Sequence, residues 1–271
     1  MRDLVTMSFY LGVIAYTAAT TLFVIELRRR DASSFGRSAV RLLTAAALLH
    51  ALHVVTASLL TRVCPVESVH FALSLTALIA GVAYLTLRSR LRVHAMGVAM
   101  APLALVFLVS AQFVGTTPAP AVSRSLLALH VTANLLGVGL FLLAGAAAVF
   151  YLFEERRLRT KRTSWLTARL PPLDALDKTE HRLLLLGFPL LTLGIATGGY
   201  VGTQMATSAG PGLTRAILAY GAWVVVGLVL LLRASIGWRG RRAAYGTVAG
   251  AVCVLLVILL YSVRPSVGAG L

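Results

Sequence analysis

Charged side chains are scarce in this chain, and acidic ones most of all. Only 9 of its 271 residues are Asp or Glu, and all charged residues together make up 13% of the sequence, against 58% hydrophobic residues. An ordinary soluble domain is about 25% charged. The composition therefore excludes a soluble globular domain of this length and indicates an α-helical membrane protein.

About eight apolar stretches are long enough to cross a bilayer, and they leave no sizeable soluble part. They run over residues 5–26, 39–60, 69–87, 93–114, 125–152, 183–204, 214–233 and 243–263. Because open strands cannot cross lipid with unpaired backbone groups, we expect these stretches to be helices. The sequence thus predicts an all-α polytopic bundle that forms one integral membrane domain over residues 1–271.

The basic residues are distributed unevenly between alternate loops. The net charge is +16, and about 20 of the 25 Lys and Arg residues fall in or beside the odd-numbered loops. This bias predicts that the odd loops are cytoplasmic and that both termini lie outside. The charge is then explained by topology and by attraction to anionic lipid, without a nucleic-acid partner.

The longest stretch between spans, residues 154–182, carries its own start and stop signals. The segment EERRLRTKR is expected to continue the fifth helix into water, and Pro171 and Pro172 should end that course. Asp174, Asp177 and Glu180 then suit the first turns of the next helix, where carboxylates meet the positive end of the helix dipole.

Histidine is the ionisable side chain that the predicted spans hold at depth. At about 1.5 Å per residue, His53 and His130 lie about 10 Å below the outer edge and His50 about 15 Å below it. His70 opens the third stretch on the same side, so four histidines fall in the outer leaflet. His94 and His181 belong to the opposite, cytoplasmic layer.

An iron porphyrin is the ligand that this outer cluster fits best. A bare zinc or copper site prefers Cys, Met or carboxylate ligands in addition, and none accompanies these histidines. Haem needs one or two axial histidines and an apolar slot. We therefore predict a non-covalent, b-type haem with His130 and His53 as axial ligands, His50 as the alternative to His53, and His70 as a further cofactor-binding candidate. The alternative for each ring is a hydrogen bond to a neighbouring helix.

Covalent haem attachment is not expected. The chain has only two cysteines, Cys64 in a predicted outer loop and Cys253 inside the last span, and no C-x-x-C-H motif.

The second half of the chain resembles a known membrane protein family. The segments are ALHVTANLLGVGLFLLAGAAAVFYL at 128–152, PPLDALDKTEHR at 171–182, HRLLLLGFPLLTLGIATGGYVG at 181–202 and GWRGRRAAYGTVAGAV at 237–252. In order and spacing they resemble the CcsA/HemX/YpjD-type cytochrome c assembly family. The resemblance implies a multi-pass, haem-handling protein of the bacterial inner membrane. It also implies that His130 corresponds to the family histidine near the start of the fifth span.

The chain departs from the cytochrome c synthesis members of that family in two places. Their tryptophan-rich segment between the sixth and seventh spans is replaced by YVGTQMATSAGPGLTRAILAYGAW, and the histidine expected late in the seventh span is absent from VLLLRASIGWRG. These departures favour the shorter HemX/YpjD-like branch.

Three functions are consistent with these patterns. The leading interpretation is haem handling or delivery for cytochrome c assembly, without an acid or base placed for catalysis. The alternative is a non-catalytic HemX-like regulator or scaffold that docks a tetrapyrrole-synthesis enzyme or another assembly protein, with EERRLRTKR as the docking candidate. Ion transport is disfavoured, because ion-coupled pumps bury carboxylates and the sequence predicts none within the spans.

Overall fold

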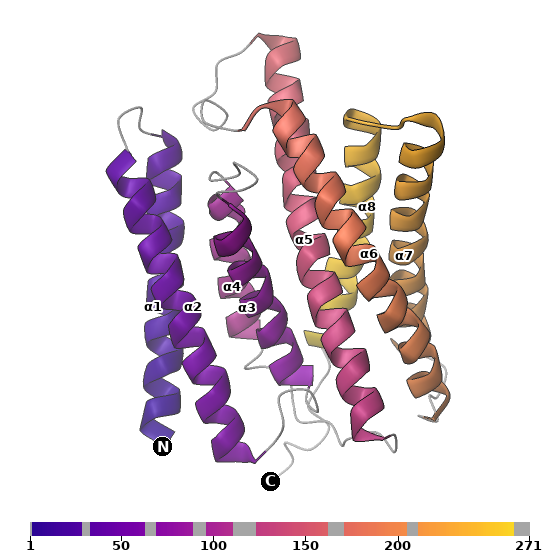
Figure 1. Cartoon of the computed structure of the whole chain (residues 1–271). Helices are drawn as coiled ribbons and strands as arrows, with labels where there is room; N and C mark the ends of the chain where they lie inside the picture. The colour runs from indigo at the N-terminus through magenta and orange to yellow at the C-terminus, as the bar shows by residue number, and fades with distance from the viewer. Residues whose placement is uncertain are drawn as a thin grey trace.

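A computed structural model describes residues 2–28, 33–62, 69–88, 96–110, 123–161, 171–204 and 211–262. Within these ranges the regular structure is helical throughout, as the sequence predicts (Figure 1). The eight helices are α1 Arg2–Arg28, α2 Ser33–Thr61, α3 Val69–Leu87, α4 Gly97–Ser110, α5 Arg124–Thr160, α6 Leu173–Gln204, α7 Pro211–Ile236 and α8 Arg241–Ser262.

Six of these helices are long and apolar enough to cross a membrane by themselves, and α3 and α4 are shorter apolar helices. The 14 residues of α4 rise about 21 Å, less than the hydrocarbon thickness of about 30 Å. The residues that the predicted fourth span adds on either side of α4 lie outside the described ranges, apart from Met96. Large apolar side chains such as Leu48 and Ile14 are more than 60% exposed, as expected of a surface that faces lipid.

The structure confirms two predictions from the sequence: the fifth helix continues beyond its apolar stretch, and the next helix starts after the two prolines. Helix α5 runs for 37 residues to Thr160 and extends past its neighbours at one end (Figure 1). Helix α6 begins directly after the two prolines, where the carbonyl of Pro172 accepts the N–H groups of Ala175 and Leu176 at 2.9 and 3.1 Å. Pro is tolerated there because the first N–H groups of a helix have no intrahelical partner.

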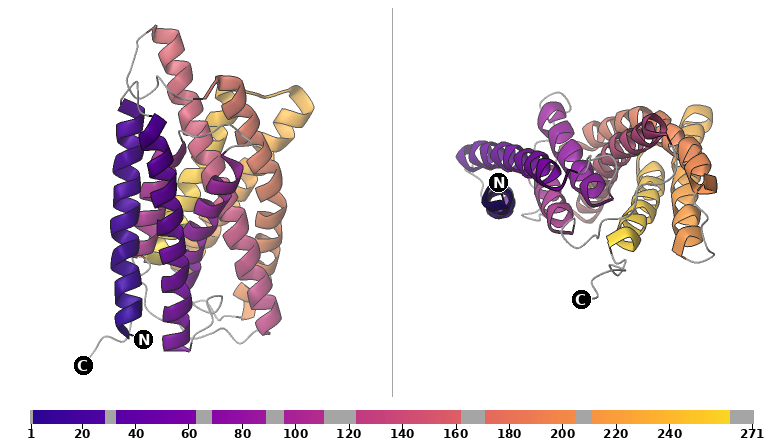
Figure 2. Two further views of the ribbon diagram at one scale, coloured as in Figure 1. Left: turned by 60° about the vertical axis from the view of Figure 1, so that its left-hand side comes forward. Right: turned by 90° about the horizontal axis from the view of Figure 1, so that it is seen from below.

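Helix α5 joins the two halves of the bundle. It packs along α6 and α8 and also contacts α3, whereas α1 packs on α2 and α4. Seen from below, the helices form a broad curved layer with α1 and α2 at one end and α7 at the other (Figure 2). Small residues bring α5 and α6 together: a Cβ on Gly137 would lie 2.9 Å from the backbone nitrogen of Leu191. Close backbone approach of this kind is how membrane helices gain packing energy.

We call one end of the bundle, where α5 and α7 finish and α6 and α8 begin, the basic end. There, an ion pair and a backbone hydrogen bond link α6, α7 and the turn between α7 and α8. The carboxylate of Asp177 on α6 accepts two bonds from Arg233 on α7, at 2.5 and 3.1 Å, and a third from the backbone N–H of Gly240 at 2.9 Å. The two side chains are 14% and 8% exposed. Asp177 thereby fixes the α7–α8 turn against α6.

Two carboxylates are buried among the described residues, and the expectation that none would be is wrong. Glu180 on α6 is 0% exposed and Glu154 on α5 is 5% exposed. Thr247 on α8 donates to Oε1 of Glu180 at 2.5 Å, and Glu154 pairs with Arg157. Glu180 is two turns into α6, where the sequence places it near water, but Thr247 of α8 contacts it. Ion-coupled pumps also bury carboxylates, but the described residues contain no group of three or more His, Cys, Asp or Glu that could hold a metal ion.

We expect Asp177→Ala to destabilise the folded protein by about 3–5 kcal/mol, because it leaves Arg233 buried without its counter-ion. The control is Asp174→Ala, which removes an exposed pair with Lys178 and should cost less than about 1 kcal/mol. Thermal denaturation of the detergent-purified variants, followed by size-exclusion chromatography, measures the difference. Equal melting temperatures for the two variants would contradict the role given to Asp177.

Candidate functional site

His50 is the most deeply buried of the predicted site residues, and it bridges three helices. Its ring is 0% exposed. Its Nδ1 lies 3.2 Å from the hydroxyl of Tyr16 on α1, and its Nε2 lies 2.6 Å from the hydroxyl of Ser74 on α3. Both ring nitrogens are therefore engaged in hydrogen bonds. The helix-bridging alternative therefore fits His50, because the two bonds join α2 to α1 and to α3.

His53 lies one turn closer to the end of α2 and has a different environment. Its Nδ1 lies 3.1 Å from the carbonyl oxygen of Val5 on α1, and its ring packs against Phe9 at a centroid distance of 5.5 Å. A carbonyl oxygen can only accept, so we assign the proton to Nδ1. Nε2 is then the nitrogen that carries the lone pair, which is the form in which histidine ligates a metal.

His130 has the same arrangement on α5. Its Nδ1 lies 3.1 Å from the carbonyl oxygen of Gly194 and 3.0 Å from the hydroxyl of Thr197, both on α6. Thr197 donates its own proton to the carbonyl of Leu193 at 2.7 Å, so its oxygen is left to accept from His130. Nδ1 again carries the proton and Nε2 the lone pair.

Asn134, one turn beyond His130, completes this polar group. Its amide nitrogen donates to the carbonyl of His130 at 2.8 Å and lies 3.2 and 3.4 Å from the two ring nitrogens. These hydrogen bonds stay within α5, while the side chain packs against Gly194 of α6.

Two glycines of α6 make the room that these side chains occupy. A Cβ on Gly198 would lie 2.8 Å from Cε1 of His130, and a Cβ on Gly194 would lie 2.4 Å from the amide oxygen of Asn134. The four-residue spacing of the glycines thus matches the four-residue spacing of His130 and Asn134. Sequence reasoning did not single out these glycines, and the matched spacing is the signal that could have identified them.

The other three histidines add little to the described site. His70 belongs to α3, but its side chain lies outside the described set, and His94 lies outside the described residues altogether. His181 is half-buried at the basic end, where its Nδ1 has no hydrogen-bond partner among the described residues.

His53 and His130 lie on helices that do not pack directly on each other. Helix α2 packs on α1 and α3, and α3 in turn packs on α5, whose other main neighbours are α6 and α8. The hydrogen bonds of His53 and His130 accordingly run to α1 and to α6. Ligation of one haem by His130 and His53 stays a prediction.

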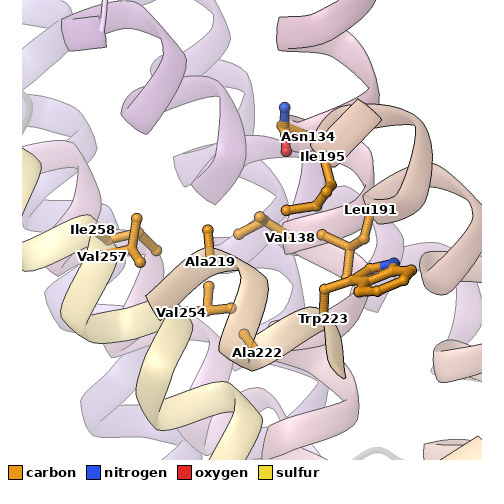
Figure 3. Close-up of a pocket in the computed structure, with 10 residues that line it drawn as sticks. All are labelled: Asn134, Val138, Leu191, Ile195, Ala219, Ala222, Trp223, Val254, Val257 and Ile258. Carbon is orange, nitrogen blue, oxygen red and sulfur yellow. The ribbon is translucent and has the colours of Figure 1, made fainter. Parts of the chain in front are cut away.

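An apolar cavity of about 110 Å³ lies between α5, α6, α7 and α8 (Figure 3). It is lined by Asn134, Val138, Leu191, Ile195, Ala219, Ala222, Trp223, Val254, Val257 and Ile258. Trp223 is fixed by a 2.9 Å hydrogen bond to Thr192 and by stacking on Phe188. Pockets that enclose a whole ligand measure about 300–1,000 Å³. Nε2 of His53 and of His130 is a nitrogen of the kind that ligates a metal, whereas this cavity has room for only a small part of a porphyrin.

An all-helical, multi-pass bundle with buried histidines defines the class of this molecule. A family model described as cytochrome C assembly protein matches residues 8–266, so the chain belongs to that family.

Curated relatives include Protein HemX of Brevibacillus brevis, 38% identical over 97 residues, which are 34% of this chain and 36% of that protein. Inner membrane protein YpjD of Escherichia coli K12 is 27% identical over 127 residues, 47% of either chain. Cytochrome c biogenesis protein CcsA of Nostoc punctiforme is 38% identical over 96 residues, 34% of this chain and 27% of that protein. The matches cover less than half the length of each of these relatives.

We expect Gly198→Ala to displace the His130 ring and to destabilise the fold by about 1–3 kcal/mol, because the added methyl group enters space that the ring fills. Gly221→Ala on α7 is the control, since a Cβ there meets no atom within 4 Å. It should be neutral or slightly stabilising, because alanine favours helix. Thermal denaturation compares them, and an equally stable Gly198→Ala protein would contradict the described packing.

Proposed function

We propose that this protein binds haem in the bacterial inner membrane and handles or delivers it for cytochrome c assembly. The observation that carries the proposal is the orientation of two histidines. His53 and His130 each direct Nδ1 to a backbone carbonyl, at 3.1 Å in both cases. Family membership and the names of the HemX, YpjD and CcsA relatives support the same function.

The hydrogen bond from Nδ1 to a carbonyl oxygen has a chemical consequence for each ring. Metal-ligating histidines almost always donate their second ring N–H to a carbonyl, carboxylate or water, which fixes the tautomer and raises the basicity of the ligating nitrogen. Val5 supplies that carbonyl to His53, and Gly194 supplies it to His130, with Thr197 as a second acceptor. Haem, when bound, would supply an iron that such nitrogens of His53 and His130 could ligate.

Between the two candidates on α2, we propose His53 as the second ligand, because its Nδ1 donates to a backbone carbonyl, as metal-ligating histidines commonly do. Tyr16 and Ser74 engage both nitrogens of His50, and ligation would require one of these bonds to break inside the bundle. His50 then serves to hold α2 against α1 and α3. His70 remains a further candidate in the same leaflet.

The chain's other residues would orient and shield the ligand. The glycines of α6 leave room for the His130 ring, and the α5–α8 cavity would accept a small apolar part of the porphyrin edge. No group in the described site is an acid or base placed for bond-making chemistry, so we propose binding and transfer in place of catalysis.

A regulator or scaffold is the second candidate, and one observation favours it. Helix α5 extends past its neighbours at the basic end, where Arg156, Arg159 and Lys161 are exposed. A charged helix that stands clear of the membrane is a suitable surface for a soluble partner. Purified protein that shows no haem absorbance after loading would favour this candidate.

The ligand assignment is tested by spectra of single variants after haem loading. We expect His130→Ala and His53→Ala each to lose the low-spin absorbance, because each removes an axial nitrogen. His50→Gln should keep it, since its amide can still bond to Tyr16 and Ser74. His181→Ala, at the basic end, is the control. Full low-spin absorbance in both His130→Ala and His53→Ala would reject the assignment.

The second acceptor of His130 provides a finer test. We expect Thr197→Val to weaken haem binding by about tenfold, the lower limit for loss of a residue that orients a metal-ligating histidine. Thr17→Val is the control, because the hydroxyl of Thr17 bonds only within α1 and is exposed. Haem titration of the two variants measures the change. An unchanged affinity in Thr197→Val would mean that Thr197 does not orient the ring.

A further inference from the structure

The turn between α7 and α8 is a rigid feature of the basic end. Gly237 and Gly240 have φ angles of +70° and +66°, which glycine adopts without strain. The N–H of Trp238 bonds back to the carbonyl of Leu232, six residues earlier, at 3.2 Å, which holds the turn against the end of α7. Asp177 accepts the N–H of Gly240, so the turn is fixed at both ends.

Three arginines of this turn face outward, and little negative charge balances them. Arg239, Arg241 and Arg242 are exposed. A carboxylate oxygen of Glu155 lies 3.8 Å from Nε of Arg241, and its other oxygen already bonds Arg159 at 2.8 Å. Asp177 is closer to the turn, but its charge is neutralised by Arg233.

Aromatic and apolar side chains lie directly beside these arginines. The guanidinium of Arg241 lies 5.4 Å from the ring centroid of Tyr245, which is 53% exposed. Beyond Tyr245, the exposed residues Val252, Leu256 and Leu259 recur every three to four positions along α8. On α7, Leu231 and Ile236 are 62% and 66% exposed. The arginines thus lie beside two rows of exposed apolar side chains, one on α7 and one on α8, which are suited to face lipid and which we call the apolar tracks.

We propose that this turn binds the phosphate group of an anionic phospholipid, in the leaflet that the charge bias predicts to be cytoplasmic. Guanidinium groups bond phosphate oxygens in pairs, and tyrosine and tryptophan favour the level of lipid headgroups. The apolar tracks of α7 and α8 then receive the acyl chains, which a soluble anion lacks. Because the turn is already fixed, binding orders little of the protein. This site is independent of haem.

The test uses the full chain in nanodiscs that contain equal parts of phosphatidylglycerol and phosphatidylcholine. Native mass spectrometry counts the retained lipids. The variant is Arg239→Gln/Arg241→Gln/Arg242→Gln, and the control is Arg156→Gln/Lys161→Gln/Arg182→Gln, which removes the same charge from exposed positions at the same end. We expect about a tenfold loss of retained phosphatidylglycerol in the first and less than about a twofold loss in the second.

A second variant separates binding from folding. Tyr245→Leu keeps an apolar side chain but removes the ring beside Arg241, and we expect it to lower phosphatidylglycerol retention while the melting temperature is unchanged. Equal losses in the two triple variants would reduce the effect to net charge and overturn the proposal. Protection from melting by inorganic phosphate as strong as that by phosphatidylglycerol would overturn it too, because a soluble anion would then suffice.

Discussion

Hydrocarbon offers no hydrogen-bond partner, and this constraint decides how the few polar groups of the chain are arranged. An unsatisfied polar group in lipid costs several kcal/mol. Several buried polar side chains accordingly find partners on other helices, whereas buried threonines such as Thr56 and Thr179 bond to carbonyls of their own helix. His50 bonds α1 and α3, His130 bonds α6, and Glu180 bonds α8. Each bond also fixes how two helices are rotated against each other, so the same few contacts determine both packing and the aim of the histidine rings.

The α5–α6 pair is where packing and function meet. Gly137 lets the two backbones approach, and Gly194 and Gly198 leave space for Asn134 and His130. Once the helices are this close, the carbonyl of Gly194 is within reach of the His130 ring. The glycine-rich span that looks like a packing motif therefore also selects the tautomer of a histidine.

Much of the architecture could be predicted from sequence, because hydrophobic length and Pro or charge signals act locally. The helices, the start of α6 after Pro172 and the continuation of α5 to Thr160 are of this kind. The direction in which a side chain points is not determined by the local sequence. His50 and His53 share a helix and differ by three positions, yet α1 offers a hydroxyl to one and a carbonyl to the other. Burial of Glu180 likewise depends on Thr247, 67 residues further along the chain.

The most direct measurement of the proposed function is the electron paramagnetic resonance spectrum of the ferric, haem-loaded protein. Two axial imidazoles give a low-spin signal with the anisotropy of bis-histidine haem, and that signal is the result expected from ligation by His130 and His53. A high-spin signal alone, or the signal of unbound haem, would contradict ligation of one iron by both rings.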